Sequence, residues 1–98
     1  MTKYVIERGI PAVGSSTRDE LHAAAVKSCK TLDELGSDIQ WVHSYVTDDK
    51  IYCVYLAANE QLVREHAVRA GFPADNISAV RAMIDPTMGT VARVAVGK

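Results

Sequence analysis

The chain begins with a strand pattern and continues with a helical one. Residues 3–8 are rich in Tyr, Val and Ile and are followed by several Gly and Pro residues, which predicts a strand that ends in a loop. Thr17 and Glu20 then fit a capping box, in which two side chains satisfy backbone N–H groups at the start of a helix. Apolar residues recur at helical spacing as far as a glycine at position 36, so we expect a helix over residues 18–35.

The middle of the chain predicts a β-hairpin followed by a second helix. Residues 39–47 and 51–57 are β-branched and aromatic, and Asp48 and Asp49 stand between them as a tight turn. Asn59 can cap the next helix, whose apolar stripe runs on to a glycine that ends it. The hairpin therefore connects directly to a helix, with a short loop between them.

A last strand completes the pattern and sets the fold class. Residues 77–84 predict this strand, which Asp85 and Pro86 stop. The resulting order β-α-β-β-α-β is the ferredoxin-like α+β arrangement, in which two helices cover one face of a four-stranded antiparallel sheet. We expect one domain over residues 1–86, and residues 87–98 to form a C-terminal tail or an extra edge strand.

The predicted turn determines which hairpin residues share a face of the sheet. If the turn has two residues, cross-strand partners lie on the same side of the pleat, and one face carries Trp41, His43, Tyr45, Tyr52, Val54 and Leu56. The opposite face is smaller and more aliphatic, as expected beneath packed helices. The aromatic face would then be exposed in a monomer, and exposed apolar patches of this size mark a partner. We therefore expect a homodimer joined through the sheet. A slip of one residue at the turn would exchange the two faces.

Composition narrows the classes of function. The chain has 98 residues, of which 48% are hydrophobic and 23% charged, as in an ordinary globular domain. A net charge of -1 gives no electrostatic reason to expect a nucleic-acid partner. No apolar run approaches the roughly 20 residues of a membrane span, so we expect no membrane partner and a cytoplasmic location. In that reducing compartment Cys29 and Cys53 are expected to be free, buried thiols.

The strand residues offer one candidate site. His43 and Tyr45 are two positions apart on one strand, so an imidazole and a phenol lie on the same side and can reach a common ligand. The alternative is an interface histidine that is hydrogen-bonded to a phenol or to the backbone. Glu7 is a possible ligand or acid-base partner of His43 across the dimer interface, or it forms an ordinary salt bridge at the strand end.

The second helix offers another candidate site. His66 falls on its apolar stripe, which directs the ring toward the sheet, near Cys53 and Tyr55. A cysteine and a histidine there could be a nucleophile with its base, or two soft metal ligands. The alternative is a core histidine that bonds to a backbone carbonyl or to Tyr55. None of the histidines has the HExxH, HxH or CxxC spacing of a metal motif.

Four segments of the chain stand out together: KYVIER at residues 3–8, IQWVHSYV at 39–46, REHA at 64–67 and GFP at 71–73. They resemble segments of a bacterial family of small domains of unknown function, one of which is described as a nickel-binding protein. The resemblance covers about residues 3–86. It implies a ferredoxin-like fold, a dimer joined through the sheets, and nickel held near that interface.

The same resemblance identifies candidate metal contacts. The polar residues that match the family's motifs are His43, Tyr45, Glu7 and His66. Imidazole suits nickel, and carboxylate or phenolate oxygens can complete an open site.

Three functions follow as hypotheses. The first is a protein that binds nickel or a related divalent transition metal for buffering or sequestration. The second is a small-molecule enzyme, with a pocket between sheet and helices lined by Cys53, Tyr55 and His66. The third is a noncatalytic dimerisation or interaction module, in which His43 and Tyr45 only bond across the interface.

Overall fold

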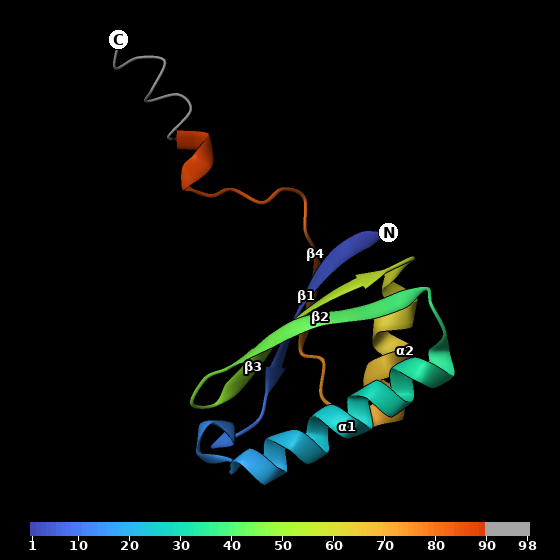
Figure 1. Cartoon of the computed structure of the whole chain (residues 1–98), viewed down its shortest axis with the longest axis vertical. Coiled ribbons are helices and arrows are strands. Elements are labelled where there is room, and N and C mark those ends of the chain that lie inside the picture. The colour runs from blue at the N-terminus through green and yellow to red at the C-terminus, as the bar shows by residue number, and fades with distance from the viewer. Residues whose placement is uncertain (90–98) are drawn as a thin grey trace.

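Strands and helices follow one another in the predicted order in the computed structural model, which describes residues 1–89 (Figure 1). Two features add to that pattern in this part of the chain, a short 3-10 turn in the loop after the first strand and a helical segment at residues 86–89. The elements are β1 (Thr2–Gly9), η1 (Val13–Ser15), α1 (Arg18–Leu35), β2 (Ile39–Val46), β3 (Lys50–Ala57), α2 (Glu60–Ala70) and β4 (Asn76–Ala79).

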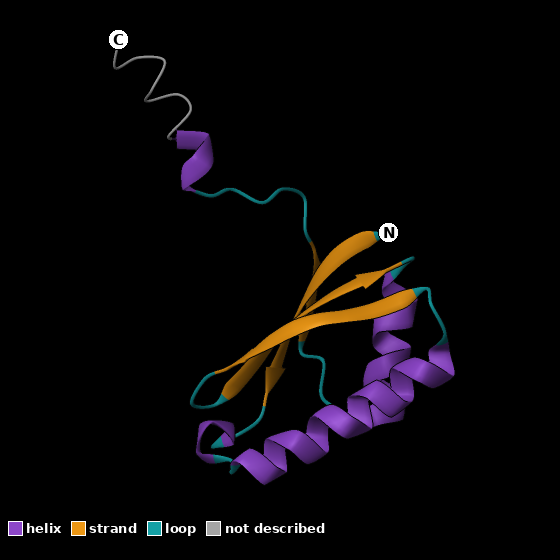
Figure 2. Ribbon diagram, viewed as in Figure 1, coloured by secondary structure: helices purple, strands orange, loops and turns teal. Residues whose placement is uncertain are grey.

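The strands form one antiparallel sheet with the order β2-β3-β1-β4. β1 lies inside the sheet and pairs along its whole length with β3, from Thr2 opposite Ala57 to Gly9 opposite Lys50. Both α1 and α2 lie on the same side of the sheet (Figure 2). This is the ferredoxin-like α+β fold that the element order predicted.

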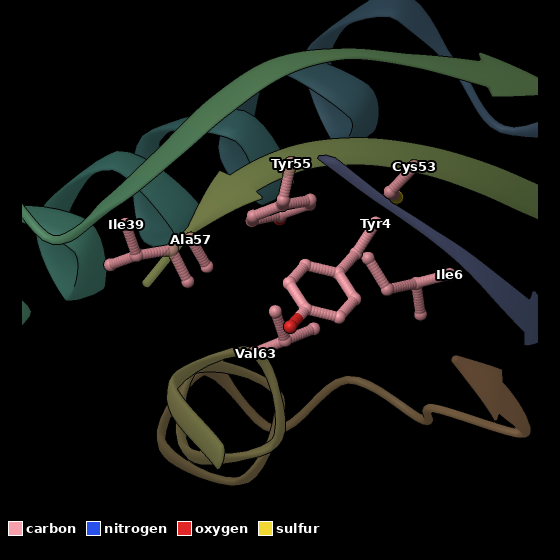
Figure 3. Close-up of a cluster of buried hydrophobic side chains, with 7 residues drawn as sticks. All are labelled: Tyr4, Ile6, Ile39, Cys53, Tyr55, Ala57 and Val63. Atoms are coloured by element: carbon pink, nitrogen blue, oxygen red, sulfur yellow. The ribbon is translucent and has the colours of Figure 1, made fainter. Parts of the chain in front are cut away.

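The core lies between the sheet and the helices. Tyr4 and Ile6 point toward the helices, where they meet Val63 of α2 (Figure 3). The full cluster of buried apolar residues comprises Tyr4, Ile6, Ile39, Cys53, Tyr55, Ala57 and Val63. Because successive strand residues point to opposite faces, the residues between them in β1 lie on the other side.

We call that other side the open face, since neither helix covers it. The strand register assigns its residues, which are Lys3, Val5, Glu7, Gln40, His43, Tyr45, Lys50, Tyr52, Val54, Leu56, Asn76 and Ser78. Tyr45 is 60% exposed there. The open face is therefore apolar and aromatic over β2 and β3, and more polar toward β4.

Both helices begin and end at the residues that the sequence indicates. Thr17 and Glu20 form the predicted capping box of α1, and the Asn59 side chain accepts a hydrogen bond from the Leu62 N–H at the start of α2. Gly71 ends α2 in the left-handed conformation, with φ 75°, which glycine adopts without steric cost. The turn at Gly71 leads the chain back toward the end of β1.

One prediction about the hairpin is wrong. The turn and the pairs Tyr45 with Tyr52 and His43 with Val54 are as predicted, but Trp41 lies opposite Tyr55 rather than Leu56. The cause is a register shift between Trp41 and His43, because a bulge adds one unpaired residue and reverses the facing of every residue beyond it. Trp41 therefore lies on the helix-covered face and not on the open face.

The last strand is shorter than predicted. It ends at Ala79 rather than at residue 84, because β1 begins at Thr2 and offers few further backbone partners. Residues 80–89 extend away from the sheet (Figure 1) and expose large apolar side chains, with Met83 72%, Ile84 78% and Met88 61% exposed. The possible extra edge strand within residues 87–98 falls mostly outside the described residues.

Neither the helices nor the cysteines show features of a membrane-spanning or disulfide-linked protein within residues 1–89. No helix there combines the length and the apolar character that crossing a membrane requires. Both cysteines are free thiols as predicted, but only Cys53 is buried, whereas Cys29 is exposed on α1.

The facing of β1 can be tested by truncating Ile6, which is 0% exposed. We expect Ile6→Ala to lower the free energy of unfolding by about 2–5 kcal/mol, because it leaves a cavity beneath the helices. Val68→Ala is the control, since Val68 is 80% exposed and its truncation should change stability by less than about 0.5 kcal/mol. Urea denaturation measures both, and equal effects would contradict the assigned core.

Candidate functional site

His43 and Tyr45 form a pair on the open face. Their rings meet edge to face, with the centroids 4.9 Å apart, because alternate residues of one strand project on the same side. Both side chains are exposed. The pair therefore presents an imidazole and a phenol side by side to whatever covers the open face.

Glu7 lies on the same face but is already engaged. Its carboxylate accepts hydrogen bonds from Lys50 Nζ at 2.6 Å and from Asn76 Nδ2 at 3.0 Å. These bonds, first the one from Lys50 and then the one from Asn76, lower the pKa of Glu7 and keep it ionised. Glu7 thus forms the ordinary salt bridge that the sequence left open as an alternative.

Glu7 and the histidine pair are separated within one chain. Glu7 lies opposite Tyr52, which in turn lies opposite Tyr45, so β3 stands between them. Neighbouring strands are about 4.8 Å apart, which puts the backbones of Glu7 and Tyr45 about 10 Å apart. Within residues 1–89, no three His, Cys, Asp or Glu side chains gather in a group that could hold a metal ion.

The fourth candidate, His66, lies on the opposite side of the sheet. It projects from α2 and is 0% exposed. Its Nε2 lies 3.1 Å from Ser28 Oγ of α1, and its ring centroid lies 5.1 Å from that of Tyr55. The structure therefore brings His43, Tyr45 and Glu7 to one face and His66 to the other. The predicted position of His66 on the buried stripe of α2 is confirmed.

The environment of His66 opposes its protonation. Burial, and after it the nearby positive charge of Arg8, lower the pKa of His66 to about 4. The ring is thus neutral at physiological pH. Its Nδ1 atom is buried without a hydrogen-bond partner in the described part of the chain.

A cavity of about 380 Å³ lies on the helix-covered side, between α1 and the sheet. Cys53 and Tyr55 line it, as the pocket hypothesis proposed, but His66 does not. His66 bonds to Ser28, whereas the Cys53 thiol accepts a hydrogen bond from Arg8 Nε at 3.4 Å. The cavity therefore holds a cysteine and a tyrosine; His66 contacts the tyrosine through its ring but forms its hydrogen bond with Ser28, so no Cys53–His66 couple is present.

Arg8 also lines this cavity but is not among the predicted site residues. It is only 2% exposed, although charged residues are almost never buried without a partner. Strand alternation from Tyr4 and Ile6 to Arg8 was the available signal, since it places the arginine under the helices once Glu7 is assigned to the open face.

Comparison with known proteins places the chain in a family. A family model described as "Nickel responsive protein SCO4226-like" matches residues 4–80, and the chain belongs to this family. Among solved structures, SCO4226 from Streptomyces coelicolor A3(2) is similar, with a TM-score of 0.68 and 23% identity. The match covers 84% of this chain and 99% of that one, and it supports the fold. The comparison with curated protein sequences gave no match.

The buried His66 makes the stability of the protein dependent on pH. The unfolded chain protonates this histidine below about pH 6.5, whereas the folded protein keeps it neutral down to about pH 4. The unfolded state therefore binds more protons in this interval, and we expect the free energy of unfolding to fall by about 2 kcal/mol from pH 6.5 to 4.

Urea denaturation at a series of pH values measures this dependence. His66→Gln should reduce the slope of the free energy of unfolding against pH between pH 4 and 6.5. His22→Gln, which changes an exposed histidine of α1, should leave this slope unchanged. An identical slope in the His66 variant would show that other groups cause the acid sensitivity.

Proposed function

We propose that this protein binds nickel or a related divalent transition metal on the open face of its sheet, as a homodimer, and that it buffers or sequesters the metal. The observation that supports this function best is the exposed His43–Tyr45 pair, in a chain that belongs to a family described as nickel responsive. Regulation of the free metal needs a site that is accessible from solvent or from a dimer interface, and both side chains are exposed.

The available donors suit the metal. Imidazole nitrogen is a favoured ligand of nickel, and phenolate or carboxylate oxygens can occupy further positions. His43 is the anchor in this proposal, with Tyr45 beside it. Glu7 would have to exchange its bonds to Lys50 and Asn76 for the metal.

One chain supplies only part of such a site, which is a reason to propose a second copy. In a two-fold symmetric dimer the same surface of both chains meets itself, so each donor occurs twice at the interface. Two open faces packed together would bring His43 of one chain toward donors of the other, including Glu7 of the second copy. His43, Tyr45 and Glu7 of the two chains would then supply all the nitrogen and oxygen ligands of the metal.

The surface of the open face also favours a dimer. Tyr45 is 60% exposed, and Tyr52, Val54 and Leu56 of the neighbouring strand are half-buried on the same face. Around them Lys3, Glu7 and Lys50 provide charges, and an apolar centre with a polar rim is typical of protein interfaces. Residues 80–89 add further exposed apolar side chains, which a second copy would cover.

Nickel binding can be tested by isothermal titration of the full chain with a nickel salt. We expect saturable binding that His43→Ala weakens by more than about 10-fold, because loss of a direct ligand costs at least as much as loss of an outer-shell partner. His22→Ala is the matched control, since it removes another exposed histidine that lies on α1. Equal affinities of wild type and His43→Ala would remove the proposed site.

The dimer can be tested separately in metal-free buffer by sedimentation. We expect twice the mass of one chain for the wild type, and the mass of one chain for Tyr45→Asp, because a charge at the centre of an apolar interface is left without a partner. Val68→Asp introduces the same charge at an 80% exposed position of α2 and should stay dimeric. A wild type that sediments as a monomer at all concentrations would exclude this interface. A dimer that binds no nickel would favour the interaction module.

A further inference from the structure

Arg8 carries a buried positive charge that no carboxylate of residues 1–89 balances. It is 2% exposed, and its Nη2 atom has no hydrogen-bond partner among these residues. The ion pairs within residues 1–89 join Lys50 with Glu7, Arg64 with Glu60 and Arg69 with Glu65, so none involves Arg8. An unpaired buried charge is costly, and a buried polar group without a partner in the protein points to a bound water, ion or ligand.

The guanidinium is held in a fixed position. Its Nε donates to Cys53 Sγ at 3.4 Å, and its Nη1 donates to the Pro73 carbonyl at 2.6 Å. The ring of Phe72 packs on it, with the ring centroid 5.6 Å from Cζ. These contacts leave one edge of the guanidinium, at Nη2, for a further acceptor.

This arginine lines the cavity between α1 and the sheet. Its volume of about 380 Å³ is within the range of small-molecule pockets, about 300–1,000 Å³. The buried lining residues Arg8, Ser28 and Tyr55 form a polar floor, and the exposed Glu20 lies at the mouth, where its carboxylate caps α1. Most of the remaining wall is apolar, including Val13, Leu21, Ala24, Ala25, Val46 and Ile51.

We propose that this cavity binds a small apolar carboxylic acid, whose carboxylate pairs with Arg8 and whose hydrocarbon body lies against α1. Arginine recognises carboxylates through a planar set of donors, which suits a single anionic head. The site is on the helix-covered side of the sheet, so it is separate from the proposed nickel site.

The electrostatics of the floor support a monoanion. Burial, which is the largest effect, raises the pKa of Tyr55, so the phenol keeps its proton and can donate to an anion. His66 behind Ser28 is neutral, with a pKa of about 4, and adds no charge. Arg8 thus provides the one positive charge of the floor, which matches a carboxylate better than a doubly charged phosphate.

The chain contains a built-in reporter for this site. Trp41 is its single tryptophan and lines the cavity, so its fluorescence responds to a molecule that enters. We suggest titrating the full chain in metal-free buffer with octanoate, 1-octanol and octyl phosphate. We expect saturable binding of octanoate that is tenfold or more tighter than that of the alcohol, as for a hydrogen bond to a charged group.

Two variants separate the contribution of the Arg8 charge to binding from that of the apolar pocket. Arg8→Met should bind octanoate and 1-octanol about equally, and thermal unfolding should show that it stays folded, because an apolar side chain replaces an uncompensated charge. Val68→Ala lies outside the cavity and should bind as the wild type does.

Three results would overturn the proposal, and the first two need no variant. The first is no saturable response to octanoate, which would mean that water satisfies Arg8. The second is tighter binding of octyl phosphate than of octanoate. The third is unchanged preference for octanoate over the alcohol in Arg8→Met.

Discussion

The pairing of β1 with β3 is the constraint on which the rest of the molecule depends. β1 lies inside the sheet and is paired along its whole length, so the facing of its residues cannot change without loss of the core. One set, Tyr4, Ile6 and Arg8, lies beneath the helices, and the alternate set lies on the open face. A single strand thus contributes to both candidate sites and keeps them on opposite sides of the sheet.

The helix-covered side is well packed beneath α2 but contains a cavity beneath α1. Tyr4, Ile6 and Val63 fill the space beneath α2, whereas small side chains of α1 such as Ala24 and Ala25 leave the cavity next to Arg8. The loop after α2 then contributes Phe72 and the Pro73 carbonyl to the guanidinium. The arginine is therefore positioned by contacts from distant parts of the chain.

Much of the fold could be predicted because its determinants are local. The capping box at Thr17, the turn after β2 and the stripe that buries His66 each depend on residues close in sequence. The bulge before His43 could not be predicted in this way, since Val42 is a β-branched residue that also fits a regular strand. The end of β4 depends on where its partner β1 begins, which is likewise a long-range property.

The candidate sites were harder to predict for the same reason. Local alternation identified the His43–Tyr45 pair, but the ion pair of Glu7 with Lys50 requires the pairing of β1 with β3. The role of Arg8 could not be predicted, because its hydrogen-bond partners lie 45 and 65 positions away in the sequence. The proposed metal site on the open face also needs donors from a second copy. The sequence predicts that this face is apolar and aromatic, but not how two copies would be oriented on it.

The central claim is that the two faces of the sheet have different tasks, with metal held on the open face. Anomalous diffraction at the nickel edge from crystals grown with nickel tests it most directly. The account predicts a nickel peak next to the His43 imidazole, between two open faces, and no peak in the cavity beside Arg8. A peak at His66 or at the exposed His22, with none at His43, would contradict it.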